Sequence, residues 1–335
     1  MSPVVTSPRC VSAAASIPAA AAPPKRVVSL IASATEMVYA LGCGSWLVGR
    51  SHECDYPPEV GQLPACSAAN VDPHASSGEI DQQVKAALAA GQGVYRLDTA
   101  LLESLAPEVI LTQHHCEVCA VSLRDVESAI CQFAYRALQP RVISLHPQQL
   151  EDIWHDIQQV AEALGVQDRG LQLVAMLQAR LQELSEQCAA YRAQLPAAPR
   201  VVCLEWLDPL MTAGNWMPEL VTAIGAECVL AEPGKPSSWI TWQQLRHADP
   251  DIIILMPCGF DLTRTLVESE VLRHLPDVEQ LRAVQHGRLF ATDGNHFFNR
   301  PGPRVVDSAV ILAEIVYEQF IRSAAESHAW RRVCW

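Results

Sequence analysis

The sequence has little positive charge and no long hydrophobic run. Its 335 residues include 24 lysines and arginines against 37 aspartates and glutamates, which gives a formal net charge of −13. This balance excludes nucleic acid as a partner, because binding to phosphates needs basic patches. No apolar run approaches the roughly 18 residues of a membrane span, so we expect no transmembrane segment.

The sequence motifs of several enzyme classes are also missing. The chain contains no G-x-S-x-G, no Walker A loop and no G-x-G-x-x-G. Gly42 and Gly44 follow a predicted helix rather than a strand, so they indicate the end of that helix and not a phosphate-binding loop. These absences favour a binding protein over an enzyme.

Two stretches of the chain resemble each other. The segment Arg26–Leu30 is echoed by Arg200–Leu204, and the segment Leu105–Leu111 by Ala248–Leu255. Each copy contains a β-branched apolar run without polar alternation, which is typical of a strand buried on both faces of a parallel sheet. The repeat predicts two similar lobes with a ligand-binding cleft between them.

The alternation of strands and helices predicts an α/β fold with two Rossmann-like lobes. Both lobes should have mostly parallel sheets, and one long rigid helix should join them. We expect strands at 26–30, 47–50, 109–112, 142–145, 201–205, 252–256 and 289–292. The predicted organisation is a disordered leader (1–25), a first lobe (26–145), connecting helices (146–199), a second lobe (200–327) and a tail (328–335). A capping box is expected at the first helix, with Ser33 as N-cap and Glu36 at N3.

The twelve cysteines are scattered rather than spaced as a disulfide framework. Several fall in predicted buried elements, where a free cysteine behaves as a small hydrophobe. Pro3, Pro8 and Pro18 interrupt the apolar stretch that a secretory signal needs. We therefore expect a cytoplasmic location, with a periplasmic or organellar location as the alternative.

Aromatic, imidazole and thiol side chains follow the predicted strands. Ligands of open parallel sheets bind beyond the carboxyl ends of the strands, so these residues are candidate ligand contacts. Apolar walls with a few polar groups suit a large, flat, partly apolar ligand. The candidates are His52, Cys54, Tyr56, His114, Cys116, Trp206, Trp216, Trp239, Phe260, His296, Phe297 and Arg300.

One cluster in the first lobe also fits a metal. Cys116-x-x-Cys119 lies beside His114 and His115, and a neighbouring loop supplies His52 and Cys54. Zinc takes Cys and His ligands, and an iron–sulfur cluster takes thiolates. A redox pair and unligated thiols are the alternatives for the same residues.

Four motifs resemble the vitamin B12-binding, periplasmic binding protein-like members of the substrate-binding protein superfamily of ABC transporters. They are Arg26–Leu30 with Ser33–Glu36, Val48–Ser51 leading to Asp55–Pro58, Leu105–Ile110, and Asn299–Arg304. Ser51–Pro58 and Cys116–Ala120 are similar to stretches of a cobalamin-binding branch. The resemblance covers roughly 25–320 and implies the class III fold, in which a single helix joins the lobes.

The resemblance also implies a ligand and a partner. Tyr56, His114 and Trp206, with Trp239 and Phe297, would pack on a corrin ring, and a histidine or thiol would ligate its cobalt. An ABC permease would be the transport partner. The surface glutamates that transport members present to the permease have no clear match at Leu97–Ala100 or Gly214–Glu219.

We therefore predict a substrate-binding or carrier protein that holds a corrinoid in the interlobe cleft. One alternative is a metal or iron–sulfur protein that uses the His/Cys cluster of the first lobe. The other is a corrinoid-handling enzyme that acts through a thiol such as Cys116.

Overall fold

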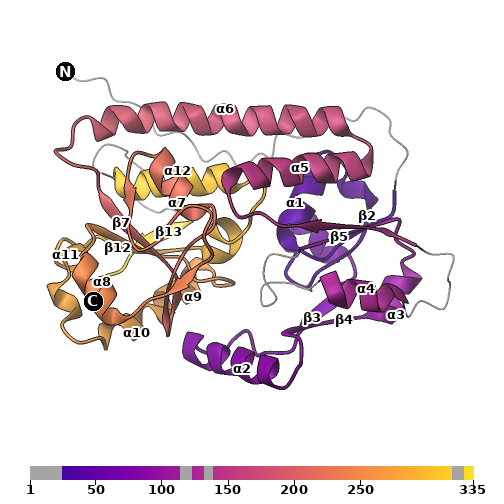
Figure 1. The fold of residues 1–335 in the computed structure, drawn as a ribbon, viewed down its shortest axis with the longest axis horizontal. Coiled ribbons are helices and arrows are strands. Elements are labelled where there is room, and N and C mark those ends of the chain that lie inside the picture. The colour runs from indigo at the N-terminus through magenta and orange to yellow at the C-terminus, as the bar shows by residue number, and fades with distance from the viewer. Residues whose placement is uncertain (1–24, 114–122, 132–138, 319–327) are drawn as a thin grey trace. The chain divides into compact units, whose positions relative to one another are not determined.

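A computed structural model describes residues 25–113, 123–131, 139–318 and 328–335 of the protein (Figure 1). The described chain divides into two compact units. The first unit contains residues 25–75 and the described part of 79–177, and the second contains residues 76–78 and the described part of 178–335. No helix in these described ranges is long and apolar enough to cross a membrane.

The first unit is built on a parallel sheet of four strands in the order β2-β1-β5-β6. Its strands are β1 (Val27–Ser29), β2 (Leu47–Arg50), β5 (Val109–Gln113) and β6 (Arg141–Leu145). The apolar runs predicted all four. A separate antiparallel pair, β3 (Ser67–Ala69) and β4 (Tyr95–Leu97), was not expected because each strand has only three residues.

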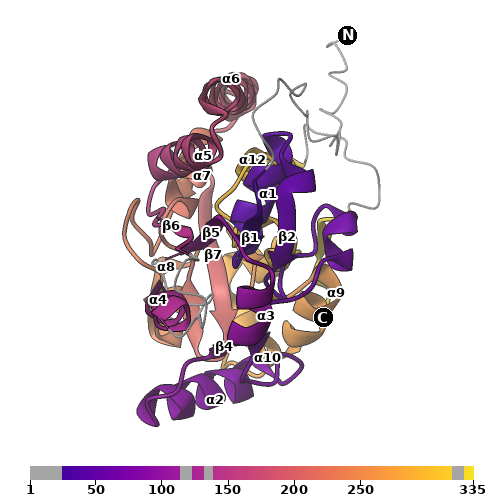
Figure 2. The ribbon, with the colours of Figure 1, turned by 90° about the vertical axis from the view of Figure 1, so that its right-hand side faces the viewer.

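Helices cover both faces of this sheet (Figure 2). They are α1 (Ala32–Ala40), α3 (Thr99–Ser104), α4 (Leu123–Cys131) and α5 (Leu150–Leu164). Helix α2 (Ser77–Ala89) lies apart from this sheet (Figure 1), and two 3-10 turns, η1 (Gly44–Trp46) and η2 (Pro58–Gln62), follow α1 and β2. On one face, Val28 and Ile110 of the sheet pack against Leu102 of α3 and Val126 of α4. On the other face, α1 contacts β1, and α5 contacts β5 and β6, as a doubly covered sheet requires.

The predicted capping box at α1 is wrong. The helix begins at Ala32, its N-cap is Ile31 in extended conformation, and no side chain caps it. Ser33 lies inside the first turn and is buried, so it cannot flank the helix as an N-cap. The same device does occur at Thr241 and Gln244, where each side chain bonds the other residue's backbone N–H.

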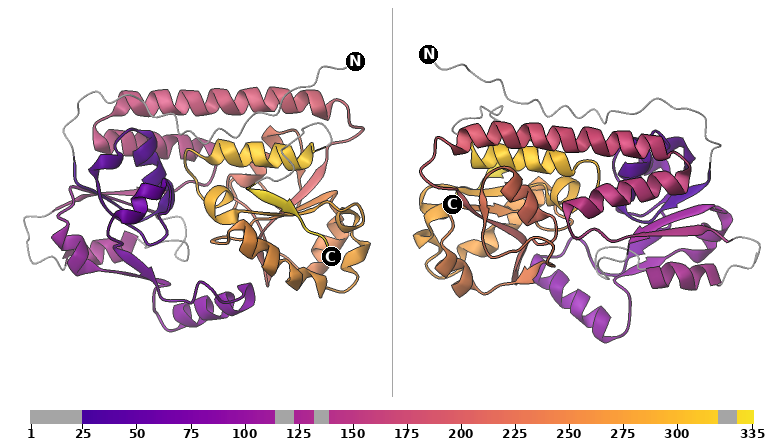
Figure 3. Two further views of the ribbon diagram at one scale, coloured as in Figure 1. Left: turned by 180° about the vertical axis from the view of Figure 1, so that it is seen from behind. Right: turned by 45° about the horizontal axis from the view of Figure 1, so that its top comes forward.

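Helix α6 (Gln167–Arg192) is continuous over 26 residues, or about 39 Å (Figure 3). The boundary between the two units falls inside it, after residue 177. Val174, Leu177 and Leu184 of this helix are buried, whereas Leu171 is 57% exposed. A helix without a break between the units confirms the long connector that the sequence predicts.

The second unit is built on a mixed sheet of seven strands. They are β7 (Arg200–Leu207), β8 (Leu210–Thr212), β9 (Glu227–Cys228), β10 (Ser238–Trp239), β11 (Ile252–Leu255), β12 (Leu289–Thr292) and β13 (Trp330–Arg332). The order is β10-β8-β7-β11-β12-β13, and β9 also pairs with β7. β7, β9, β10, β11 and β12 run in one direction, while β8 and β13 run in the opposite direction.

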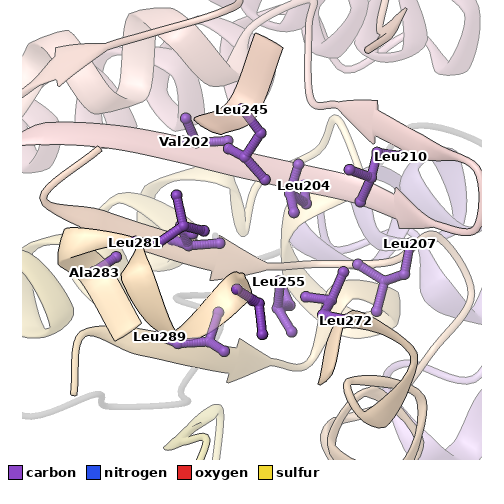
Figure 4. Close-up of a cluster of buried hydrophobic side chains, with 12 residues drawn as sticks. Val202, Leu204, Leu207, Leu210, Leu245, Leu255, Leu272, Leu281, Ala283 and Leu289 are labelled. Carbon is purple, nitrogen blue, oxygen red and sulfur yellow. The ribbon is translucent and has the colours of Figure 1, made fainter. Parts of the chain in front are cut away.

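Leucine-rich packing on one face of this sheet forms its core (Figure 4). Val202 and Leu204 of β7 and Leu255 of β11 meet Leu245 and Leu272 from the covering helices. The helical segments of the unit are α7 (Met217–Ala223), α8 (Trp242–Ala248), α9 (Leu262–Glu268), α10 (Glu270–Arg273), η3 (Val278–Gln280), α11 (Arg282–Gln285), the π-helical turn η4 (Gly294–Phe298) and α12 (Val305–Val316). Helices α7 and α12 pack against each other. This core fixes the ends of β7, β11 and β12, where most of the unit's candidate residues lie.

Candidate functional site

His52 follows β2 and is held as a neutral imidazole. Its Nδ1 lies 2.9 Å from the hydroxyl of Ser67, and its ring packs 5.4 Å from that of Tyr95. Burial, with the positive charges of Arg50 and Arg96, lowers the pKa of His52. The carboxylate of Glu53, 3.9 Å from Nε2, therefore does not face a charged partner at neutral pH.

Cys54 lies in the interior rather than at the surface. It is 1% exposed, and its sulfur accepts a hydrogen bond from the hydroxyl of Thr35 at 3.0 Å. It packs with Ala32 and Val60 in a small apolar cluster. A thiol in this position acts as a core residue and offers no surface to a ligand. Tyr56, on the same loop, is half-buried and keeps part of its ring accessible.

The rest of the predicted metal cluster, His114, His115, Cys116 and Cys119, lies outside the described residues. Within the described ranges, no group of three or more His, Cys, Asp and Glu side chains is placed to hold a metal ion. His52 and Cys54 contact different partners, Ser67 and Thr35. The two described members of the cluster, His52 and Cys54, therefore give no support to a zinc or iron–sulfur site.

Trp206, near the end of β7, is the best supported aromatic side chain of the second unit. Its indole N–H donates to the carbonyl oxygen of Asp208 at 3.1 Å. Its ring meets that of Phe260 edge to face at 5.4 Å. Phe260 is 1% exposed, and the guanidinium of Arg264 stacks 3.5 Å from its ring centroid. Phe260 thus packs against Trp206, which is itself only half-buried.

The other two candidate tryptophans of this unit differ in exposure. Trp216, the N-cap of α7, is 6% exposed and belongs to the core. Trp239, on the edge strand β10, is 55% exposed. Only Trp239 of this pair presents a flat apolar surface, since a buried indole has no free face.

The π-helical turn after β12 holds a carboxylate–imidazole pair. Asp293 accepts from the backbone N–H of His296 at 2.8 Å and from its ring Nδ1 at 2.7 Å. A carboxylate on one ring nitrogen fixes the orientation of an imidazole and directs the other nitrogen outward. His296 is partly exposed, so the turn presents its ring at the strand end.

Phe297 and Arg300 come from the same segment but lie differently. Phe297 is partly exposed, and the guanidinium of Arg304 lies 5.4 Å from its ring centroid. Arg300 is 5% exposed and donates to the side-chain oxygen of Asn295 at 3.3 Å. Phe297 can therefore contact a ligand at the surface, whereas Arg300 stabilises the turn from inside through its bond to Asn295.

Glu205, near the carboxyl end of β7, was not predicted as a site residue. Glu205 accepts a hydrogen bond from the hydroxyl of Ser237 at 2.7 Å, and that hydroxyl accepts from the backbone N–H of Gly214 at 3.1 Å. Burial raises the pKa of Glu205, and the bond from Ser237 opposes that shift. The spacing of Glu205 and Asp208 is commonplace, so only the fold reveals this arrangement.

The chain is similar to two curated bacterial proteins over most of its length. It is 24% identical to an uncharacterized ABC transporter substrate-binding lipoprotein of Bacillus subtilis, over 88% of this chain and 80% of that protein. It is also 24% identical to the vitamin B12-binding protein of Pectobacterium atrosepticum, over 87% and 88% of the two chains.

Solved structures share the fold. The periplasmic vitamin B12 binding protein of Vibrio cholerae superposes with a TM-score of 0.61 at 19% identity, covering 90% of this chain and 99% of that one. A periplasmic heme binding protein from Pseudomonas aeruginosa gives 0.67 at 20% identity, with 88% and 93% covered. The comparison confirms the class III fold with its two α/β lobes.

The expected cytoplasmic location is wrong. The similar proteins are periplasmic or are lipoproteins of ABC transporters, which act outside the cytoplasm. The expectation rested on the scattered cysteines and on the prolines that interrupt the first residues, and most of the described cysteines are buried. None of the described cysteines is in a disulfide, and Cys188 is so buried that its pKa rises to about 12. Thiols that serve as buried apolar side chains carry no information about the redox state of a compartment.

One family model spans most of the sequence. The model of periplasmic binding proteins matches residues 27–295, from the first residue of β1 into the turn that carries His296. This range includes the sheets of both units except β13, the continuous helix α6 and the strand ends described above. The chain therefore belongs to the periplasmic binding protein family.

Proposed function

We propose that the protein binds a corrinoid outside the cytoplasm and serves an ABC permease as its substrate-binding protein. The observation that carries the proposal is the set of partly exposed aromatic rings, Trp206, Trp239 and Phe297, at the strand ends and sheet edge of the second unit. Flat apolar rings suit a large planar ligand. The vitamin B12-binding relative supports the choice of a corrinoid. The cleft expected between two lobes stays a prediction.

A visible spectrum tests this proposal directly. We expect the purified protein to retain cyanocobalamin through desalting, at a stoichiometry near one, because burial of a large ring gives slow dissociation. Calorimetric titration then gives the dissociation constant. Loss of the chromophore on desalting, together with no heat of binding, would rule out a corrinoid.

Trp206→Ala should weaken cyanocobalamin binding by about 30-fold or more, since a buried aromatic anchor commonly contributes 2 kcal/mol or more to binding. The matched control is Val267→Ala, which shortens an exposed side chain of the same unit. Thermal melting of both variants separates loss of affinity from loss of fold. An unchanged dissociation constant in Trp206→Ala would remove this residue from the site.

Heme is the second candidate ligand, and one observation favours it. The imidazole of His296 is oriented by Asp293 in the manner of a metal-ligating histidine. The heme-binding structural neighbour has the same fold. Both a corrinoid and a heme carry a metal that takes an axial nitrogen ligand.

The heme candidate predicts a shifted Soret band when hemin is titrated into the protein. His296→Ala should abolish the spectrum of a histidine-ligated iron, while His247→Ala, an exposed histidine on α8, should leave it unchanged. If cyanocobalamin binds tightly, and hemin binds weakly without a shift of its Soret band, the ligand is a corrinoid.

A further inference from the structure

Strand β7 carries a β-bulge beside the proposed ligand surface. Leu204 pairs with Thr212 of β8, but Trp206 pairs with Met211, so the register shifts between them. Glu205 is the extra residue at this shift. A bulge redirects a side chain that would otherwise alternate with its neighbours, and bulges are common beside binding sites. Glu205 thus lies next to Trp206 at the end of the strand.

The chain fixes one oxygen of the Glu205 carboxyl group. Its Oε2 accepts from the hydroxyl of Ser237, which in turn accepts from Gly214. Gly214 is held closely, because a Cβ there would come within 2.4 Å of the carbonyl oxygen of Lys235. Among the described residues, no hydrogen bond satisfies the other oxygen, Oε1. Oε2 is therefore held by the fold, while Oε1 of this half-buried residue makes no hydrogen bond within the described part of the chain.

In the part of the chain that the structure describes, no positive charge near Glu205 offsets the negative charge that a ligand carboxylate would add. Burial is the main cause that raises its pKa, and no basic side chain contributes to the shift. No lysine or arginine in the described ranges forms an ion pair with it. A ligand carboxylate brought next to the ionised Glu205 would meet a like charge that no neighbouring base among these residues offsets, and this disfavours it.

We propose that Glu205 selects a ligand whose edge carries carboxamides over one whose edge carries carboxylates. A carboxamide N–H donates to Oε1, whereas a carboxylate has no proton to donate. Corrinoids carry carboxamide side chains around the ring, and heme carries two propionates. The inference rests on the proposed function and deepens it, because it names the peripheral chemistry that the site accepts.

Cyanocobalamin and its monocarboxylic acids, in which one peripheral carboxamide is hydrolysed, form a matched set of probes. We expect at least one of these acids to bind the wild-type protein about tenfold or more weakly than cyanocobalamin, as a charge-assisted hydrogen bond implies. The selectivity ratio is the dissociation constant of the acid divided by that of cyanocobalamin. In Glu205→Gln this ratio should fall to within about threefold of one, because glutamine keeps the bond from Ser237 but carries no charge.

Two further variants make the result decisive. Glu232→Gln makes the same chemical change at an exposed position in the loop between β9 and β10, and should leave the ratio at its wild-type value. Ser237→Ala releases Oε2 and should lower the ratio even if Glu205→Gln does not fold. Equal ratios in the wild type and in both site variants, with cyanocobalamin still bound, would overturn the inference alone. Failure of the wild-type protein to bind cyanocobalamin would instead overturn the proposed function.

Discussion

Gly294→Ala should destabilise the second unit by about 2–3 kcal/mol. A Cβ at this position would lie 2.3 Å from the carbonyl oxygen of Pro257 and 2.7 Å from the carbonyl group of Met256. Both neighbours are buried backbone at the end of β11, which cannot rotate away as a flexible side chain would. Overpacking of this kind forces a backbone shift. The shift would also move the turn that holds the Asp293–His296 pair.

Urea unfolding followed by tryptophan fluorescence measures the effect, since most tryptophans lie in the second unit. The control is Gly61→Ala, where a Cβ would meet nothing within 4 Å, and its effect should stay within about 0.5 kcal/mol. We expect Gly294→Ala to lose ligand affinity as well. Equal unfolding midpoints for the two variants would show that the turn adapts to the added methyl group.

Asp156→Asn should stabilise the protein above pH 7 and have little effect near pH 4. Burial raises the pKa of Asp156 from 3.8 to about 7, with Asp152 adding to the shift and a backbone hydrogen bond at His146 opposing it. Asp156 is 5% exposed, and its Oδ2 has no hydrogen-bond partner. The ionised form is therefore poorly accommodated in the folded state.

The sign follows from proton binding. Between pH 3.8 and about 7 the folded protein keeps the proton that the unfolded chain has lost. The stability conferred by the raised pKa is complete below pH 4 and is lost by about 1.4 kcal/mol per pH unit as the pH rises to 7, a total of about 4 kcal/mol. Asparagine carries no charge, so this dependence disappears in the variant.

Urea midpoints of the wild type and Asp156→Asn, compared from pH 4 to pH 8.5, test the prediction. The difference should grow with pH and level off above about pH 7.5. Asp168→Asn makes the same chemical change at an exposed position in the first turn of α6 and serves as the matched control. A constant difference between the wild type and Asp156→Asn would mean that Asp156 stays ionised and solvated.

The main strands could be predicted from the sequence because each is a run of buried β-branched residues. Val109–Gln113 and Ile252–Leu255 contain no polar alternation, and both lie in the centre of a sheet. The connector could be predicted because helix α6 combines a long apolar periodicity with two prolines after its end. Short antiparallel strands such as β3 and β8 escaped prediction, since three residues carry too weak a pattern.

The candidate site was predictable in location but not in detail. Chain order and strand ends placed Trp206 and His296 correctly at the carboxyl ends of the strands. The sequence could not separate Trp239, which is exposed, from Trp216, which is buried. The sequence also could not show that the backbone of Met256 and Pro257 comes too close to residue 294 for any side chain but glycine. Nor could it show that a bulge redirects Glu205. Contacts between distant segments decide these points, and local patterns do not record them.

The residues expected to form only a tail have a structural role at the edge of the second sheet. Strand β13 pairs antiparallel with β12, and Trp330 packs its ring on Phe290 while its N–H donates to Glu314. The outermost strand is therefore three residues long and contains Arg331 and Arg332. Short, charged border strands discourage the pairing of one molecule's sheet with that of another. The last strand thus protects β12, which is buried and mostly apolar, from aggregation through its open side.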